Sequence, residues 1–192
     1  MRLRHAKTLI TGKPGVGKTT LVQKTIKRMG SVNMAGFCTS EIRCTGSHLG
    51  FELQGLNGGR RTLAHMDIDS RHRVGRYGVD KDGFEKFLAT LDLLNPCVEL
   101  IVIDEIGKME LFSRNFRDLV RDILNSDIQM LATVAMKGGG LIRETKQRPD
   151  VHLFEVIRLV EERLFFRGGR CCQVQHIGNR LVIPQFLCDP DC

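Results

Sequence analysis

The chain has 192 residues, of which 42% are hydrophobic and 27% charged, a balance typical of a soluble domain with its own core. Lys and Arg number 29 against 22 Asp and Glu, but no dense basic run accompanies this excess, so nucleic acid is not the favoured partner. No apolar run approaches the ~20 residues that span a membrane, and the N-terminal apolar stretch is too short for a signal peptide, so we expect a cytoplasmic protein without membrane contact.

The first third of the chain predicts a strand, a helix and then antiparallel strands. Residues 7–11 (KTLIT) form a short buried strand, and residues 18–29 place apolar side chains at helical spacing. Between about residues 34 and 65, apolar and polar residues alternate around the turn signals TGS and NGG. This pattern predicts an antiparallel hairpin insertion.

The rest of the chain alternates helices and strands. We predict helices at 79–94, 111–124 and 159–166, strands at 97–105, 129–135 and 151–156, a loop at 137–150 with a short helix as an option, and a hairpin at 172–184 around Gly178 and Asn179. Such alternation favours right-handed crossovers and a mainly parallel sheet covered on both faces. The predicted fold class is therefore α/β with three αβα layers.

The cysteines at the C-terminus could hold zinc, but their pattern favours free thiols. The chain has seven, an odd number, and four of them fall in the last 22 residues: Cys171, Cys172, Cys188 and Cys192. Their spacing is not a paired C-x-x-C pattern, so we expect unligated thiols in preference to zinc. Reduced thiols also agree with the absence of a secretory signal.

Residues 12–19, GKPGVGKT, fit the pattern G-x-x-x-x-G-K-[ST] in full and stand between a predicted strand and helix. Backbone N–H groups of such a loop cradle phosphate oxygens, while Lys18 reaches the β- and γ-phosphates and the Thr19 hydroxyl can ligate Mg²⁺. A glycine-rich turn with accidental spacing is the alternative, which the register of strand, loop and helix disfavours. The candidate phosphate-binding residues are Gly12, Lys13, Pro14, Gly15, Val16, Gly17, Lys18, Thr19 and Thr20.

A second part of this site is expected where the strand LIVIDE ends. Asp104 is a candidate metal ligand, and the adjacent Glu105 is a candidate base for the attacking water. Two acids closing an apolar strand could also be a solvated strand end. Lys108, three residues on, either stabilises charge on the γ-phosphate or is an ordinary surface lysine. Thr133 either senses the γ-phosphate or is a plain buried threonine.

Four strings in this order, GKPGVGKTTL, GFCTSEIR, RVGRYGVD and VIDEIGKMELFS, resemble the cancer-related nucleoside-triphosphatase family, known also from thermophilic microbes. The resemblance covers about residues 7–166 and implies a RecA-like P-loop domain. It further implies Mg²⁺-dependent hydrolysis of ATP, GTP and other nucleoside triphosphates with loose base selectivity. By the same resemblance, Glu41 and Arg43 of TSEIR and Arg73 of RVGRY face the nucleotide. We expect this domain to span residues 1–167, with 168–192 as a C-terminal extension packed on it.

Two other functions stay open at this stage. A nucleotide or small-molecule kinase shares the phosphate loop, and residues 136–148, which carry Arg143 and Arg148, could serve as its lid. A nucleotide-gated module that binds RNA, DNA or a protein is the other alternative. The oligomeric state does not follow from the sequence, although a monomer is favoured.

Overall fold

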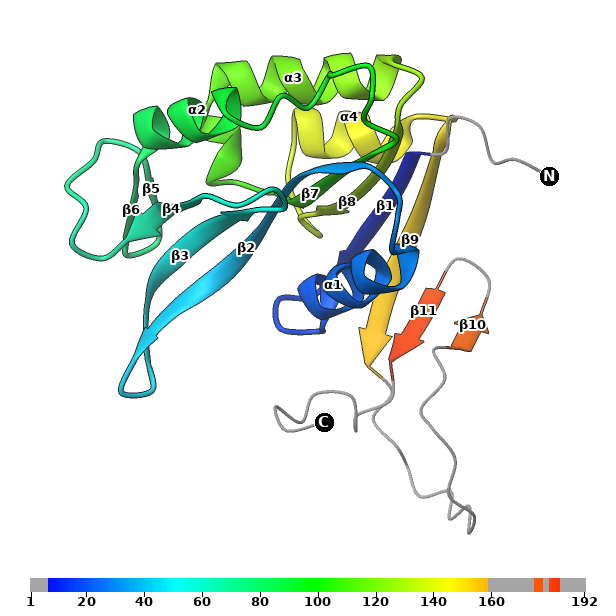
Figure 1. Cartoon of the computed structure of the whole chain (residues 1–192). Coiled ribbons are helices and arrows are strands. Elements are labelled where there is room, and N and C mark those ends of the chain that lie inside the picture. Colours follow the sequence, from blue (N-terminus) through cyan, green and yellow to red (C-terminus); the bar gives the residue numbers. More distant parts are fainter. Residues whose placement is uncertain (1–6, 159–174, 178–179, 184–192) are drawn as a thin grey trace, which may run out of the picture.

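The computed structural model describes residues 7–158, 175–177 and 180–183 (Figure 1). The strands are β1 (Lys7–Gly12), β2 (Met34–Cys44), β3 (Ser47–Gly55), β4 (Arg60–His65), β5 (Arg73–Val74), β6 (Tyr77–Val79), β7 (Leu100–Ile106), β8 (Gln129–Val134), β9 (Val151–Arg158), β10 (Gln175–Ile177) and β11 (Arg180–Ile183). The helices are α1 (Lys18–Met29), α2 (Lys81–Ala89), α3 (Arg114–Asn125) and α4 (Leu141–Gln147), with a 3-10 turn η1 (Glu110–Phe112).

One sheet joins all of these strands, in the order β10-β11-β9-β1-β8-β7-β2-β3-β4-β6-β5. Neighbours from β11 to β2 are parallel, and those from β2 to β5 are antiparallel. The carboxyl ends of β1, β7 and β8 therefore meet at one edge of the sheet, where ligands bind in open α/β folds. The predicted α/β class, the mainly parallel sheet and the antiparallel insertion are all confirmed.

Helices cover both faces of the parallel sheet. Alternate side chains of one strand point to opposite faces, and β7 shows this clearly: Ile101 and Ile103 belong to the core under α2, α3 and α4, while Val102 belongs to the core under α1. Figure 1 shows α1 on one side of the sheet and the other three helices on the opposite side. These are the three layers that the sequence predicts.

The close approach of β2 to β7 explains why residue 36 is a glycine. Gly36 has φ +139°, and a Cβ at this position would lie 1.8 Å from the carbonyl oxygen of Val102. No larger residue fits there without displacing a strand of the parallel core.

Several predicted boundaries are corrected. The helix predicted at 79–94 ends at Ala89, because the chain turns at Asp92, where φ is +44°. The strand predicted at 97–105 begins only at Leu100 and continues to Ile106. The helix predicted from residue 111 starts at Arg114, because the Ser113 side chain caps it by accepting a hydrogen bond from the Phe116 N–H at 3.0 Å.

Other elements were predicted only in part. The short strands β5 and β6 were not predicted, whereas the short helix that the sequence left as an option in 137–150 is present as α4. The predicted helix 159–166 lies outside the described residues. β10 and β11 pair antiparallel on either side of residues 178–179, and β11 adds to β9 in parallel. The division of the chain at residue 167 stays a prediction.

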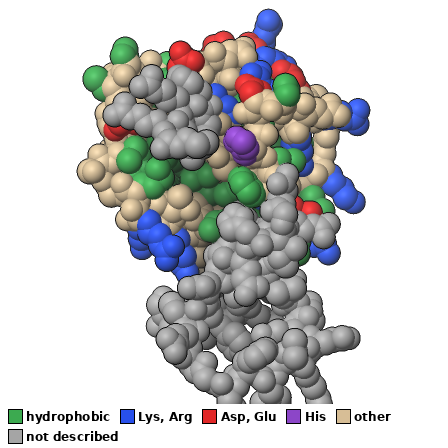
Figure 2. Space-filling model, turned by 90° about the vertical axis from the view of Figure 1, so that its right-hand side faces the viewer, with side chains coloured by type: hydrophobic (Ala, Val, Ile, Leu, Met, Phe, Trp, Pro, Cys, Tyr) green, Lys and Arg blue, Asp and Glu red, His purple; other side chains and the backbone are tan. Residues whose placement is uncertain are grey.

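The edge of the sheet near β9 carries hydrophobic side chains. Seen from that side, they form a group next to the residues drawn in grey (Figure 2). Among the described residues, no helix is both long and apolar enough to cross a membrane.

Candidate active site

The glycine-rich loop joins the end of β1 to the start of α1. Gly12 has φ +155°, and a Cβ there would lie 2.7 Å from the Val156 carbonyl oxygen of β9. Gly17, the residue before α1, has φ +101°, a conformation that side-chain-bearing residues rarely adopt. Val16 is buried beneath the loop, and its N–H donates to the Lys13 carbonyl at 3.3 Å. The backbone is thus folded into a curved loop at a helix N-terminus, the arrangement that binds phosphate.

Asp104 and Glu105 lie near the end of β7, joined by a cis peptide bond. Asp104 is 2% exposed. Its Oδ1 accepts a hydrogen bond from the Thr133 hydroxyl of β8, and its main-chain oxygen accepts one from the Thr39 hydroxyl of β2. Within the described part of the chain, Oδ2 is buried without a hydrogen-bond partner. A buried carboxylate oxygen left in this way is suited to a cation or an added donor.

Lys18 links the loop to the acids. Its Nζ lies 3.4 Å from the Gly12 carbonyl oxygen and 3.5 Å from Glu105 Oε2. Burial raises the pKa of both Asp104 and Glu105, and the Lys18 charge opposes the shift in each case. The neighbouring hydroxyls of Thr133 and Thr19 also lower the pKa of Asp104. The protonation of Asp104 and of Glu105 therefore depends on the charge of Lys18.

A single cavity of about 770 Å³ brings most of the predicted site together. The predicted residues that line it are Gly12, Lys13, Pro14, Gly15, Lys18, Thr19, Glu41, Asp104, Glu105 and Lys108. Val16 is buried under the loop, Gly17 precedes α1, and Thr20 is exposed on α1. These three do not line the cavity.

The two predicted arginines also lie outside the cavity lining. The Arg43 side chain is 62% exposed and pairs with Glu41. The Arg73 guanidinium donates to the Arg76 carbonyl oxygen at 2.8 Å, within the turn between β5 and β6. Glu41 itself lines the cavity and also lies 3.0 Å from His48 Nε2.

The sequence alone did not single out several lining residues. Phe51, Val74, Met109 and Met136 give the cavity an apolar wall. Glu110 also lines it and is 5% exposed, and burial raises the pKa of its carboxyl to about 8. The only hint of Glu110 in the sequence is its place in the string DEIGKMELFS, where a glutamate looks like any surface acid of a first helical turn.

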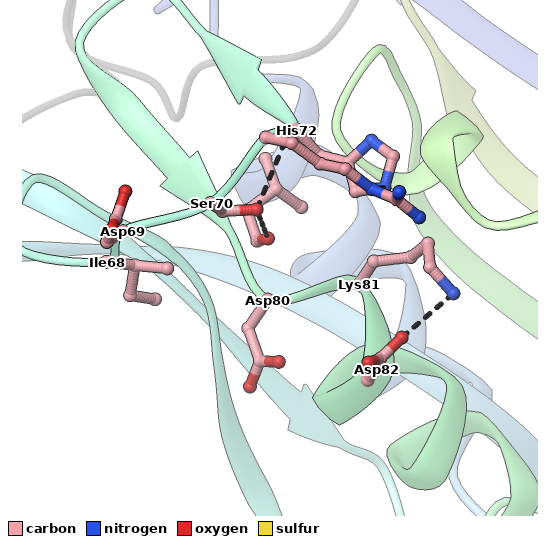
Figure 3. A pocket seen from close by; sticks show the side chains of 9 residues that line it. Ile68, Asp69, Ser70, His72, Asp80, Lys81 and Asp82 are labelled. Atoms are coloured by element: carbon pink, nitrogen blue, oxygen red, sulfur yellow. Dashed lines mark hydrogen bonds and ion pairs between the residues drawn. The ribbon is translucent and has the colours of Figure 1, made fainter.

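A smaller cavity of about 240 Å³ lies beside the N-terminus of α2 (Figure 3). Its polar side chains serve the fold: Ser70 donates to the Val79 carbonyl at 2.9 Å, Asp80 accepts from the Gly83 N–H at 2.9 Å, and Lys81 pairs with Asp82 at 2.9 Å. We assign no ligand to it.

Comparisons with known proteins agree with this geometry. A sequence model of the NTPase family matches residues 7–167. Nucleoside-triphosphatase THEP1 of Thermotoga sp. (strain RQ2) is 42% identical over 151 residues, which cover 78% of this chain and 86% of that protein. The cancer-related nucleoside-triphosphatase homolog of Mus musculus is 39% identical over 172 residues, which cover 81% of this chain and 89% of that protein.

Two solved structures share the fold. The crystal structure of THEP1 from Aquifex aeolicus matches with a TM-score of 0.70 and 37% identity, covering 78% of this chain and 88% of that one. The solution structure of a human cancer-related nucleoside triphosphatase matches with a TM-score of 0.64 and 36% identity, covering 79% and 89%. The chain therefore belongs to the nucleoside-triphosphatase (NTPase) family with its P-loop αβα fold, and it is a nucleotide-binding hydrolase.

Proposed function

We propose that this hydrolase is a Mg²⁺-dependent, cytoplasmic phosphohydrolase that converts ATP, GTP and other nucleoside triphosphates to the diphosphate and phosphate. The observation that carries the proposal is the single cavity in which the phosphate loop faces Asp104 and Glu105. Broad acceptance of bases is part of the proposal and is supported by the family resemblance.

The loop and Lys18 bind the phosphates. The N–H groups of the loop surround the β-phosphate, and Lys18 contacts the β- and γ-phosphates. The Lys18 Nζ lies 3.5 Å from Glu105 Oε2. When the Lys18 ammonium group binds the triphosphate instead of Glu105, the Glu105 carboxylate becomes free to bind water beside the γ-phosphate.

Asp104 and Thr19 fit a divalent cation. The unpartnered Oδ2 of Asp104 is an oxygen of the kind that Mg²⁺ prefers, and the Thr19 hydroxyl lines the same cavity. A bound Mg²⁺ supplies positive charge that neutralises the β- and γ-phosphate oxygens. The Thr133 and Thr39 hydroxyls hold the Asp104 carboxyl and its backbone in place for this role.

Glu105 receives the proton of the attacking water. The water oxygen forms a bond to the γ-phosphorus as the bond from that phosphorus to the β–γ bridging oxygen breaks, which leaves a nucleoside diphosphate. Burial raises the pKa of Glu105 and so increases its basicity. Lys108, exposed at the cavity, stabilises charge on the γ-phosphate oxygens as they move.

An arginine lid of the kind that kinases use is not favoured. The Arg148 guanidinium donates to the Leu124 carbonyl at 3.2 Å and to Asn125 Oδ1 at 2.9 Å, at the end of α3. Arg143 is exposed, and neither arginine lines the cavity.

Replacement of Lys18 by Ala tests the proposal. We expect Lys18→Ala to bind ATP weakly and to release phosphate at least about a hundredfold more slowly, because no backbone amide replaces the lost charge. Lys24→Ala, an exposed lysine on the same helix, is the control. Phosphate release by Lys18→Ala at the parental rate would exclude the loop as the triphosphate site.

A further inference from the structure

We infer that the cavity holds a second substrate, a nucleoside, whose hydroxyl group accepts the γ-phosphoryl group when it replaces the attacking water. This inference rests on the proposed function, because it uses the same bound triphosphate. It starts from the apolar arm of the cavity, formed by Phe51, Val74 and Met109 together with Glu41.

The strand order fixes the side of the triphosphate on which this arm lies. The phosphate loop follows β1, Asp104 and Glu105 end β7, and Glu41 and Phe51 come from β2 and β3 on the far side of β7. The loop holds the β-phosphate, so the γ-phosphate points toward the acids and the substrate's own nucleoside extends the other way. With strands about 4.8 Å apart, β3 lies about 10 Å beyond β7. The arm is therefore on the side from which the γ-phosphorus is attacked in line.

The arm adds apolar side chains and a carboxylate that an attacking water does not need. A cavity of about 770 Å³ is in the upper part of the range for sites that enclose drug-sized ligands, and such sites combine apolar walls with a few polar groups. Phe51 and Glu41 are register partners on β3 and β2. An aromatic wall beside a carboxylate binds a planar ring that carries N–H donors, which describes a nucleobase.

The groups of the arm are held in place. The Phe51 ring contacts the Tyr77 ring at 5.3 Å and the His48 ring at 5.1 Å between centroids. Arg43 and His48 bind Glu41 through Oε2, which leaves Oε1 for a donor of the ligand. The pKa of Glu41 is lowered below its usual range, with hydrogen bonds from Arg43 and His48 outweighing burial. A fixed carboxylate and a fixed ring lose little freedom when a ligand binds.

The transfer step is balanced by the residues already described. A nucleoside hydroxyl oxygen forms a bond to the γ-phosphorus, and the bond from that phosphorus to the β–γ bridging oxygen breaks. The hydroxyl proton passes to Glu105, which plays the part that it plays for water. The products are a nucleoside diphosphate and a nucleoside monophosphate.

Label transfer from ATP marked in its γ-phosphate tests the inference. The full chain is incubated with Mg²⁺ and with adenosine, guanosine, cytidine or thymidine at millimolar concentration. We expect labelled nucleoside monophosphate with at least one of them. Phe51→Ala, which removes the wall, and Val74→Phe, which fills the arm, should each lower this transfer about ten- to a hundredfold. In both variants transfer should fall more than phosphate release without nucleoside. Both activities of Leu94→Ala, an exposed residue outside the cavity, should stay within about twofold of the parental rate.

The outcomes separate this inference from the proposed function. Absence of phosphate release by the unchanged protein contradicts the proposed function itself. Normal phosphate release without transfer to any of the four nucleosides overturns the second-substrate site alone. A rise in KM for ATP but not for inorganic tripolyphosphate in Phe51→Ala would also overturn it, because the arm would then hold the base of the triphosphate.

Discussion

At the scale of single residues, two adjacent carboxylates occupy different surroundings. Asp104 is buried, and threonine hydroxyl groups donate hydrogen bonds to both its side chain and its main-chain oxygen. The Glu105 side chain is 32% exposed and has the Lys18 ammonium as its ion partner. The first environment holds a carboxylate still, as a metal ligand requires. The environment of Glu105 leaves its carboxylate free once the Lys18 ammonium group binds phosphate, as a base that activates water requires.

Glu110 provides a prediction about pH. Its pKa rises from 4.5 to about 8 through burial, with the charges of Glu105 and Asp104 adding to the shift. The folded protein therefore keeps a proton that the unfolded chain releases between these two pH values. The free energy of unfolding should fall as pH rises through this window, by at most about 1.4 kcal/mol per pH unit from this residue.

Glu110→Gln keeps the shape of the neutral carboxyl and cannot ionise. We expect denaturant unfolding to show a weaker pH dependence in the variant, and greater stability than the unchanged protein at pH 8 and above. Because acids far from Glu110 titrate equally in both proteins, the difference between the two curves isolates Glu110 together with Glu105 and Asp104, whose charges act on it. Parallel curves from pH 5 to pH 9 would show that Glu110 ionises normally in the folded state.

At the scale of secondary-structure elements, Lys7 ties β1 to α3. Its side chain is 2% exposed, and its Nζ donates to the Ile123 carbonyl at 2.7 Å and to the Ile128 carbonyl. Burial lowers the pKa of Lys7, and the two carbonyl groups, one from the last turn of α3 and one from the loop before β8, compensate the ammonium group.

Lys7→Met should therefore destabilise the fold without touching the site. The thioether fills similar space but removes the donor of the Ile128 carbonyl, whereas the Ile123 carbonyl keeps its hydrogen bonds from Ser126. The lost donor costs about 1–3 kcal/mol. Equilibrium unfolding in urea measures this loss, and Lys24→Met on the exposed face of α1 is the matched control. Equal stability of the two variants would mean that water satisfies the Ile128 carbonyl group.

Elements with a strong local signal were predicted well, and those fixed by tertiary contacts were not. The spacing of Gly12, Gly17 and Lys18 can be recognised within one short segment of the sequence. The same is true of the apolar run before Asp104. The strands β5 and β6 have only two and three residues, too few to show an alternating pattern. The start of α3 depends on the cap that Ser113 provides. The apolar pattern runs from residue 111 through Ser113 without a break, so the pattern alone places the start of the helix too early.

The same reason explains the parts of the site that were missed. Phe51 and Val74 lie far from Asp104 in the sequence, and only the order of β7, β2 and β3 brings their strands to one cavity. Arg43 and Arg73 were expected there from the family strings, but contacts with Glu41 and with the Arg76 carbonyl hold them outside the lining. Glutamate is a residue type that is rarely buried, so no sequence pattern predicts the burial of Glu110.

At the scale of the whole molecule, the C-terminal strands extend the sheet away from the site. β11 pairs with Glu155–Arg158 of β9, and β10 pairs with β11. The cavity lining comes from elsewhere, from the loop after β1 through β2, β3, β5 and β7 to the end of β8. The C-terminal strands and the cavity therefore lie in separate parts of the sheet.

Truncation after Arg167 should keep hydrolysis and reduce solubility. Loss of β11 exposes the N–H and C=O groups of the β9 edge, on a side of the molecule where hydrophobic side chains already lie at the surface (Figure 2). We expect phosphate release per folded molecule within about twofold of the full chain and a lower aggregation temperature by light scattering. A folded, monomeric truncation without activity would mean that the tail contributes to the site.

We propose that Glu105 activates the water while Asp104 binds the metal ion. Paired measurements on Glu105→Gln, nucleotide affinity by titration and hydrolysis in a single turnover, test it most directly. Gln keeps the size and hydrogen bonding but not the basicity, so ATP affinity should stay within about threefold while the rate falls about 10²- to 10⁴-fold. Asp104→Asn should differ by also weakening Mg²⁺-dependent binding. Hydrolysis by Glu105→Gln at the parental rate would contradict the account.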